Sequence, residues 1–176
     1  MIPVGIIIFI MLGTNTFINI QDLTQHYLDS IEKSSAALAQ PLIEKIQSFD
    51  RSNIDIMLNT LSLQCIKLYE FNQEKNFSHF AVINASNVIA AHNNREFWGQ
   101  PVDSSDVLAA LYEQKQVLLR NDAIYHTLIP VFDAQEEYLA TVDIGVFKNV
   151  LDEVVYRIIL KAIGLLCLSL IHISEP

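Results

Sequence analysis

The stretch Ala123-Ile-Tyr-His-Thr-Leu-Ile-Pro-Val-Phe-Asp-Ala-Gln-Glu-Glu-Tyr-Leu-Ala-Thr-Val-Asp-Ile-Gly-Val-Phe147 decides the fold. Two runs rich in apolar and β-branched residues, 123–132 and 137–147, flank the polar segment Asp133–Glu136. Extended apolar runs separated by a short polar segment are typical of an antiparallel hairpin. The sequence therefore predicts two neighbouring antiparallel strands here.

The length of the connection decides which side chains share a face of this hairpin. A loop of two or four residues places Phe132 opposite Glu137 and His126 opposite Asp143, whereas a loop of three or five would shift the register and undo that pairing. In the first case one face is nearly all apolar and suits helix packing. The other face is mixed and holds Ile124, His126, Leu128, Pro130, Leu139, Thr141, Asp143 and Gly145. We therefore expect a small pocket with His126, Thr141 and Asp143; the alternatives are a structural His–Asp pair or a solvent-facing surface.

Three shorter strand-like runs precede this hairpin, at Phe77–Ile83, Val88–Asn93 and Gln116–Arg120. Asparagine-rich turns follow the first and third runs, because Asn tolerates left-handed backbone conformations. Between the second and third, Asp103–Asp106 offers an N-cap for a short helix. With the hairpin, these runs predict one five-stranded antiparallel sheet.

Two helices are predicted upstream of the sheet. The first carries an apolar stripe from Leu23 to Phe49, and we expect Pro41 to kink or break it near Gln40, because proline lacks an N–H and clashes with the preceding turn. The second is predicted to begin at Ser52, with Asp55 completing the capping pair. It carries a stripe of Ile54, Leu58, Leu61, Cys65 and Leu68. The fold class is therefore α+β.

Both ends of the chain are strongly apolar. Residues 1–21 carry no charge and are predicted to form an uncleaved transmembrane helix, since about 20 apolar residues span a bilayer; a cleaved signal peptide is the alternative. A helix after Phe147 leads into 157–167, which we expect to begin a second membrane helix. Residues 168–176 match one reading frame of a transposon mosaic-end adapter used in sequencing libraries, so we expect this stretch to be an artefact rather than a genuine tail.

Composition excludes several classes of function. Of the 176 residues, 51% are hydrophobic and 18% charged, with 11 Lys+Arg against 20 Asp+Glu. A nucleic-acid binder needs clustered basic residues, so we expect no nucleic-acid partner. The chain has no Gly-rich phosphate loop, G-x-S-x-G or H-E-x-x-H motif, so an enzyme is not favoured. The two cysteines lack the neighbours of a zinc site, and we expect no metal ion and no cofactor.

The stretch Ala81-Val-Ile-Asn-Ala-Ser-Asn-Val-Ile-Ala-Ala-His92 resembles the first hairpin of the Cache (extracellular PAS-like) sensor domains of bacterial transmembrane receptors. Asn84 and Asn87 occupy the Asp and Gly positions of that family's turn. Phe97-Trp-Gly99 resembles the glycine-marked loop that follows, and Tyr125–Phe147 resembles the closing hairpin. The resemblance covers residues 19–156, and we assign 22–156 to an extracytoplasmic sensor domain.

The resemblance implies a ligand-sensing module outside the bacterial cytoplasmic membrane. A small molecule would lie on one face of the sheet and the long helix on the other. The output domain would be a histidine kinase, chemotaxis signalling rod, nucleotide cyclase or phosphatase. The family commonly uses an acid on its last strand for ligand contact, which favours Asp143. We expect a small polar metabolite, either an amino compound held by Asp143 or a short organic acid held by His126.

Several other residues are weighed as ligand contacts. Trp98 is predicted to form a pocket wall or a core plug, and His92 and Tyr112 to be ligand contacts or satisfied edge groups. We interpret His79 as structural. The stripe from Leu23 to Leu38 predicts a homodimer through the N-terminal helix, because nothing else in the chain is expected to bury it. A ligand-free dimerising spacer is the alternative function.

Overall fold

The computed structural model describes residues 4–48, 54–72, 76–121 and 123–174, with only the backbone described for 4–10, 12, 54–56, 150–151 and 165–174. Its elements are α1 (Val4–Ser48), α2 (Ile54–Phe71), β1 (Phe77–Asn84), β2 (Ile89–His92), the 3-10 turn η2 (Arg95–Phe97), α3 (Ser105–Glu113), β3 (Val117–Arg120), β4 (Ile124–Phe132), β5 (Tyr138–Phe147) and α4 (Asn149–Ser174). They fall into two compact units, residues 1–30 with 149–176, and Ile31–Lys148. The predicted Ser52 cap lies outside the described residues.

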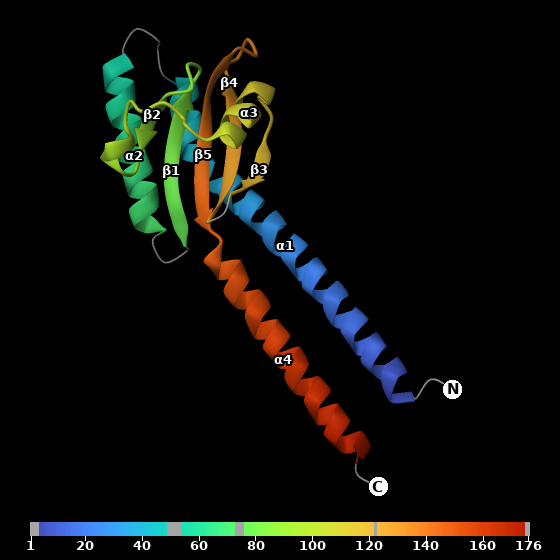
Figure 1. The fold of residues 1–176 in the computed structure, drawn as a ribbon. Helices are drawn as coiled ribbons and strands as arrows, with labels where there is room; N and C mark the ends of the chain where they lie inside the picture. Colours follow the sequence, from blue (N-terminus) through green and yellow to red (C-terminus); the bar gives the residue numbers. More distant parts are fainter. Residues whose placement is uncertain (1–3, 49–53, 73–75, 122, 175–176) are drawn as a thin grey trace. The chain divides into compact units, whose positions relative to one another are not determined.

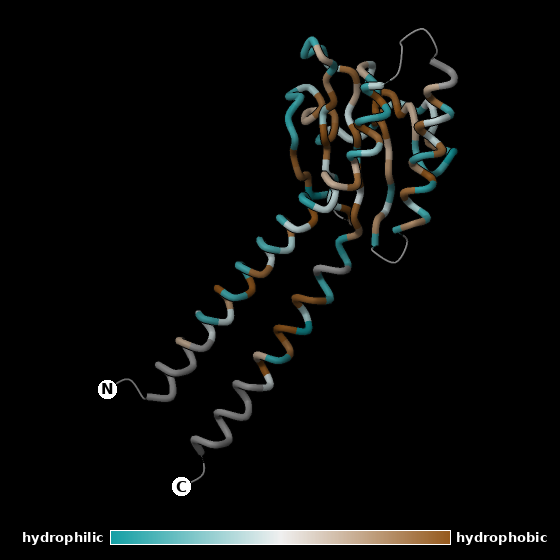
Figure 2. Tube along the Cα trace, turned by 180° about the vertical axis from the view of Figure 1, so that it is seen from behind, coloured by the Kyte–Doolittle hydropathy of each residue, from teal (hydrophilic) through white to brown (hydrophobic). Residues whose placement is uncertain are grey.

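The centre of the Ile31–Lys148 unit is a five-stranded antiparallel sheet in the order β2-β1-β5-β4-β3 (Figure 1). The first strand therefore pairs with the last, which makes β5 the central strand. In Figure 2 hydrophobic residues follow the strands and hydrophilic residues lie at the turns. The predicted α+β class and all five strands are confirmed.

One face of the sheet packs against α2 and the Ile31–Ser48 part of α1. From the helices this layer buries Ile31, Ala39, Leu42, Ile46, Leu61 and Cys65; from the strands it buries Phe80, Val82, Tyr125, Val131, Val142, Ile144 and Val146. The strand residues alternate along each strand, as expected for one face of a pleated sheet. This face is thus the apolar one that the sequence predicts.

The opposite face is covered in part by α3. Val107 and Leu111 of α3 form a small buried cluster with Ile83 of β1 and Leu128 of β4. The α3 helix begins as predicted, because the Ser104 side chain caps it by accepting a hydrogen bond from the N–H of Val107. Beside this helix, Ala81, Thr141 and Asp143 of the same face are also buried.

Of the kink or break predicted near Gln40, the break does not occur. The α1 helix continues through Pro41 to Ser48. Proline removes one intrahelical hydrogen bond, but its ring here is exposed while Ala39 and Leu42 on either side have no exposed surface. Burial of this apolar face therefore outweighs the local cost of proline.

The predicted register of the β4–β5 hairpin is also wrong. Phe132 pairs with Tyr138 rather than Glu137, which gives a five-residue loop, and Val131 pairs with Ala140, which leaves Leu139 as an extra, bulged residue. The Asp133 carboxylate stabilises the loop by accepting hydrogen bonds from the N–H groups of Gln135 and Glu137, each 2.9 Å long. The loop and the bulge each shift the register by one residue, and two such shifts return every side chain to its predicted face.

The first hairpin turns as the sequence predicts. Asn87 has a left-handed backbone with a φ of 58°, and the Asn84 side chain accepts hydrogen bonds from the N–H groups of Ser86 and Val88. In the second asparagine turn, Asp122 lies outside the described residues.

The other unit contains α4 together with the part of α1 that ends at Ser30. The helix predicted after Phe147 is confirmed as α4. In the described part of the chain, we find no helix with the length and apolar character needed to cross a membrane. The two membrane segments and the artefactual tail stay predictions.

Candidate ligand-binding site

A cavity of about 410 Å³ lies over the sheet face that carries His79, His126 and Asp143, and Tyr69 of α2 also lines it. The strands contribute Ser78, His79, Ala81, Ile83, Ile89, His92, Ile124, His126 and Asp143 to its walls. The connection into α3 contributes Phe97, Val102, Asp103 and Ser104, and α3 contributes Val107. Apolar walls with a few convergent polar groups are typical of a small-molecule site. Its ionisable groups include three histidines and one carboxylate from the strands.

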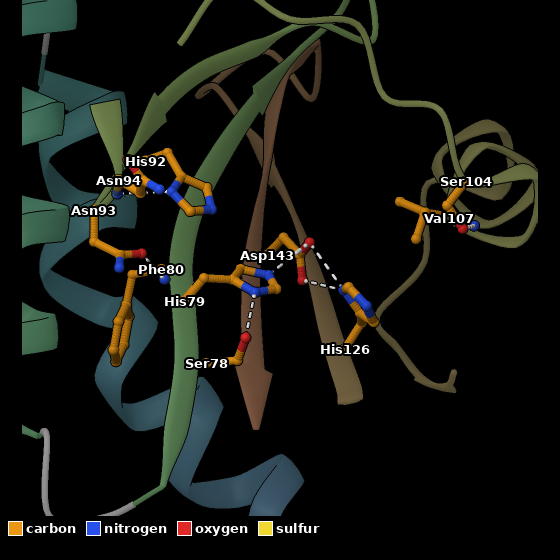
Figure 3. A network of polar contacts seen from close by, with 10 residues as sticks. All are labelled: Ser78, His79, Phe80, His92, Asn93, Asn94, Ser104, Val107, His126 and Asp143. Atoms are coloured by element: carbon orange, nitrogen blue, oxygen red, sulfur yellow. Dashed lines mark hydrogen bonds and ion pairs between the residues drawn. The ribbon is translucent and has the colours of Figure 1, made fainter. Parts of the chain in front are cut away.

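Asp143 on the central strand lies between two imidazoles (Figure 3). Its Oδ2 is 3.1 Å from His79 Nε2 on β1 and 3.1 Å from His126 Nδ1 on β4, and only 8% of its side chain is exposed. Burial favours the protonated carboxyl, but the charge of His79 and the hydrogen bonds from both histidines outweigh it. The pKa of Asp143 is therefore held well below its usual range, and the group is ionised.

His126 responds in the opposite direction to the same contact. Burial favours its neutral form, but the hydrogen bond to Asp143 and the negative charge of that carboxylate outweigh burial and raise the pKa of His126. The cavity thus contains a buried anion with a neighbour that readily becomes cationic. Such a pair can bind either a cationic or an anionic polar group from a ligand.

His92 is the neutral histidine of the cavity. Burial, reinforced by nearby His79, lowers the pKa of His92 to about 4. Its Nδ1 accepts a 2.8 Å hydrogen bond from the N–H of Asn94, so the proton lies on Nε2. The His92 ring stacks on the His79 ring, with the two ring centroids 5.4 Å apart. The centroid of the Phe97 ring lies 4.8 Å from that of His92.

Gly145 makes the convergence of the histidines possible. It pairs with His79 on one side and His126 on the other, two positions after Asp143. A Cβ at this position would overlap the His79 imidazole. Because Gly145 has no side chain, the His79 ring can lean along the sheet toward the diagonal neighbour Asp143.

The structure places the sequence-predicted candidates in four different settings. His126, Asp143 and His92 line the cavity. Thr141 lies on the same face outside the lining, and its hydroxyl is 2.8 Å from the Tyr138 hydroxyl. Trp98 lines a separate hollow of about 440 Å³ and donates its indole N–H to the His92 carbonyl, 2.7 Å away. Tyr112 is 76% exposed on α3 and does not line the cavity.

Sequence reasoning missed the position of His79, which it treated only as structural. Alternation along β1 places His79 with Ala81 and Ile83, and pairing with β5 places those residues beside Gly145, Asp143 and Thr141. The alternation was visible in the sequence. The pairing of β1 with β5, which brings His79 to the carboxylate, was not.

No protein-family model matches the chain, and no curated protein matches its sequence. Solved structures do match its fold. The E. coli DcuS sensor domain matches with a TM-score of 0.54 and 16% identity, over 72% of this chain and 95% of that one. An extracellular ligand binding receptor from Desulfohalobium retbaense DSM5692 matches with a TM-score of 0.57 and 18% identity, over 86% of this chain and 27% of that one.

A third match is the extracellular domain of vpHK1S-Z8, a protein described as a histidine kinase. Its TM-score is 0.57 at 12% identity, over 88% of this chain and 63% of that one. Together the three matches show the fold: the chain shares the α+β architecture of these three domains. The fold that the resemblance to Cache domains implies is thereby confirmed.

Proposed function

We propose that this chain contributes the extracytoplasmic small-molecule-sensing domain of a bacterial membrane signal-transduction receptor. The observation that carries the proposal is the cavity over the central strands, where buried Asp143 lies between His79 and His126. A buried carboxylate is costly unless it is paired, and strongly shifted pKa values in a cavity are typical of functional sites. Matches to a sensor domain, a ligand binding receptor and a kinase extracellular domain support the same function.

The ligand that suits this cavity is a small polar metabolite. An amino compound would place its cationic group against Asp143, and a short organic acid would place its carboxylate against protonated His126. Both complete the charge pairing that a buried polar cluster needs.

The ligand would signal through the strand that holds it. Asp143 lies on β5, which ends at Phe147, and α4 begins at Asn149. A contact that displaces β5 is therefore passed along the chain into α4. Binding changes the equilibrium only if the ligand prefers one of two states of the strand.

The remaining parts of the proposal concern the whole receptor. Residues 1–21 anchor the chain in the cytoplasmic membrane, and a second membrane helix beginning in 157–167 leads to a kinase, chemoreceptor, cyclase or phosphatase output. The domain forms a homodimer through the helix from Leu23 to Leu38. Ile31 is already buried within its own chain, so the dimer contact is carried by half-exposed Leu23, Tyr27 and Leu38.

A metabolite thermal-shift screen on the full chain, in buffer containing chelator, tests the sensing function. A bound ligand stabilises the folded state by mass action, by about 2.7 kcal/mol at a concentration 100 times its Kd. We expect an amino compound or short carboxylate to raise Tm, and Asp143→Ala or His126→Ala to abolish the shift. Tyr112→Ala is the control, because this exposed side chain does not line the cavity.

The outcomes separate sensor from spacer. A shift that survives both cavity substitutions would place the binding site elsewhere. No shift with any amino acid, amine or short carboxylate would favour the ligand-free spacer.

A further inference from the structure

We propose that His79, His126 and Asp143 bind one divalent transition-metal ion of the zinc class at the floor of the cavity. This inference deepens the proposed function, because the ion would lie in the cavity assigned to the ligand. The sequence predicts no metal site, because its two cysteines lack the neighbours of a zinc site and His79, His126 and Asp143 are far apart in the chain. Only the sheet brings them together.

The donor atoms already have the arrangement of a metal site. One ligand atom from each of the three residues lies within 4.8 Å of the others. Oδ2 of Asp143 is 3.1 Å from His79 Nε2 and 3.1 Å from His126 Nδ1. Two donors at ordinary zinc bond lengths and a tetrahedral angle are about 3.3 Å apart, which is close to the two separations between Asp143 and the histidines.

The chemistry of the donors selects the class of ion. Two imidazoles and one carboxylate suit Zn²⁺ and neighbouring first-row metals, whereas Mg²⁺ and Ca²⁺ prefer oxygen ligands. A divalent ion would pair the buried carboxylate directly. The net charge of ion and Asp143 would then be +1, with both histidines neutral.

A second layer of contacts orients the ligands. The Ser78 hydroxyl lies 3.3 Å from Nδ1 of His79 and can hold that nitrogen while Nε2 faces Asp143. Metal-binding histidines are commonly fixed in this way through their other ring nitrogen. Gly145 supplies the room for the His79 ring.

Three protein ligands leave at least one coordination position for another molecule. The side chains of His79 and His126 are 12% and 13% exposed, and both line the cavity. Water or a small ligand entering the cavity can therefore reach the ion. His92 is not the fourth ligand, because its Nδ1 accepts the hydrogen bond from Asn94 and its ring stacks on His79.

Direct metal binding by the full chain tests this site. Protein purified in detergent and stripped with chelator is titrated with Zn²⁺ by calorimetry, and its metal content is measured after dialysis. We expect one tightly bound Zn²⁺ per chain. His79→Gln, His126→Gln and Asp143→Asn should each weaken binding by at least about 100-fold, because even partners behind the ligands contribute about 10- to 100-fold.

Two further measurements separate a true site from surface binding. His26→Gln should leave Zn²⁺ affinity unchanged, because His26 is exposed on α1 and outside the cluster. Co²⁺ should give the intense visible absorption of a tetrahedral site in the wild type and in His26→Gln. That absorption should be lost in the three cluster variants.

Failure of the metal site is distinguishable from failure of the sensing function. Absence of stoichiometric Zn²⁺ binding by the folded wild type, or binding that survives all three substitutions, would overturn the metal site. A metabolite shift that persists in chelator would still support the sensor in that case. Stoichiometric Zn²⁺ binding that the cluster substitutions remove supports the site, even if no organic metabolite shifts Tm.

Discussion

At the scale of single residues, the candidate site depends on a glycine as much as on its charged groups. Gly145 separates His79 from His126 across the central strand, and its missing side chain leaves the space that the His79 ring occupies. Any larger residue would displace that ring from Asp143. The site thus consists of one carboxylate, two imidazoles and the space left by the missing side chain of Gly145.

Substitution of Gly145 should weaken ligand binding while the protein remains folded. We expect Gly145→Ala to weaken Zn²⁺ or metabolite binding by about 10- to 100-fold, the range found when the orientation of a ligand is lost. The obstacle is a side chain that can rotate away, so the sheet should remain folded. Calorimetric titration gives the affinity, and circular dichroism checks the fold.

Gly164→Ala is the matched control, because a Cβ at that position meets no other atom within 4 Å. Undiminished binding in folded Gly145→Ala would show that His79 does not need its observed position.

At the scale of elements, α1 shows how packing overrides local preference. Pro41 lies inside a continuous helix, exposed, while the buried side chains of Ala39 and Leu42 flank it. The helix keeps its apolar contacts with the sheet at the expense of one backbone hydrogen bond.

The loss of this hydrogen bond at Pro41 should lower the free energy of unfolding by a measurable amount. We expect Pro41→Ala to raise the free energy of unfolding by about 1–3 kcal/mol, since proline costs about 3 kcal/mol in a helix interior and part of this is offset by its stiffening of the unfolded chain. Urea denaturation followed by circular dichroism measures the change. Gln40→Ala, at the neighbouring exposed position, should change stability by less than about 0.5 kcal/mol. A decrease for Pro41→Ala would mean that proline is favourable at this position.

At the scale of the whole molecule, the apolar stripe of the long helix α1 bears on how the chain assembles. Leu23, Tyr27 and Leu38 are only half-buried, although they continue the stripe that buries Ile31. A half-exposed apolar stripe on a helix is suited to pairing with a second copy.

Cysteine crosslinking in membranes tests this dimer. In a Cys167→Ser background, where Cys65 is fully buried, we expect Leu23→Cys, Tyr27→Cys or Leu38→Cys to form disulfide-linked dimers. Lys33→Cys serves as the control, because Lys33 lies on the opposite side of the helix from the stripe. Equal crosslinking at Lys33, or none at the three stripe positions in folded protein, would contradict a dimer through this face.

The sequence by itself determined the five strands, the α+β class, and the apolar and mixed faces of β4 and β5, with His126 and Asp143 on the mixed face. These follow from local periodicity and turn chemistry, which short stretches of chain carry within themselves. The predicted register was wrong by two residues, yet the faces were right because side chains alternate with a period of two.

Only the tertiary structure decided the composition of the site. It placed β1 against β5, and so His79 beside Asp143, and it left Thr141, Trp98 and Tyr112 outside the cavity. It also carried α1 through Pro41. The physical reason is common to these cases: strand order, bulges and helix continuity are fixed by burial between segments far apart in the chain, which no local pattern records.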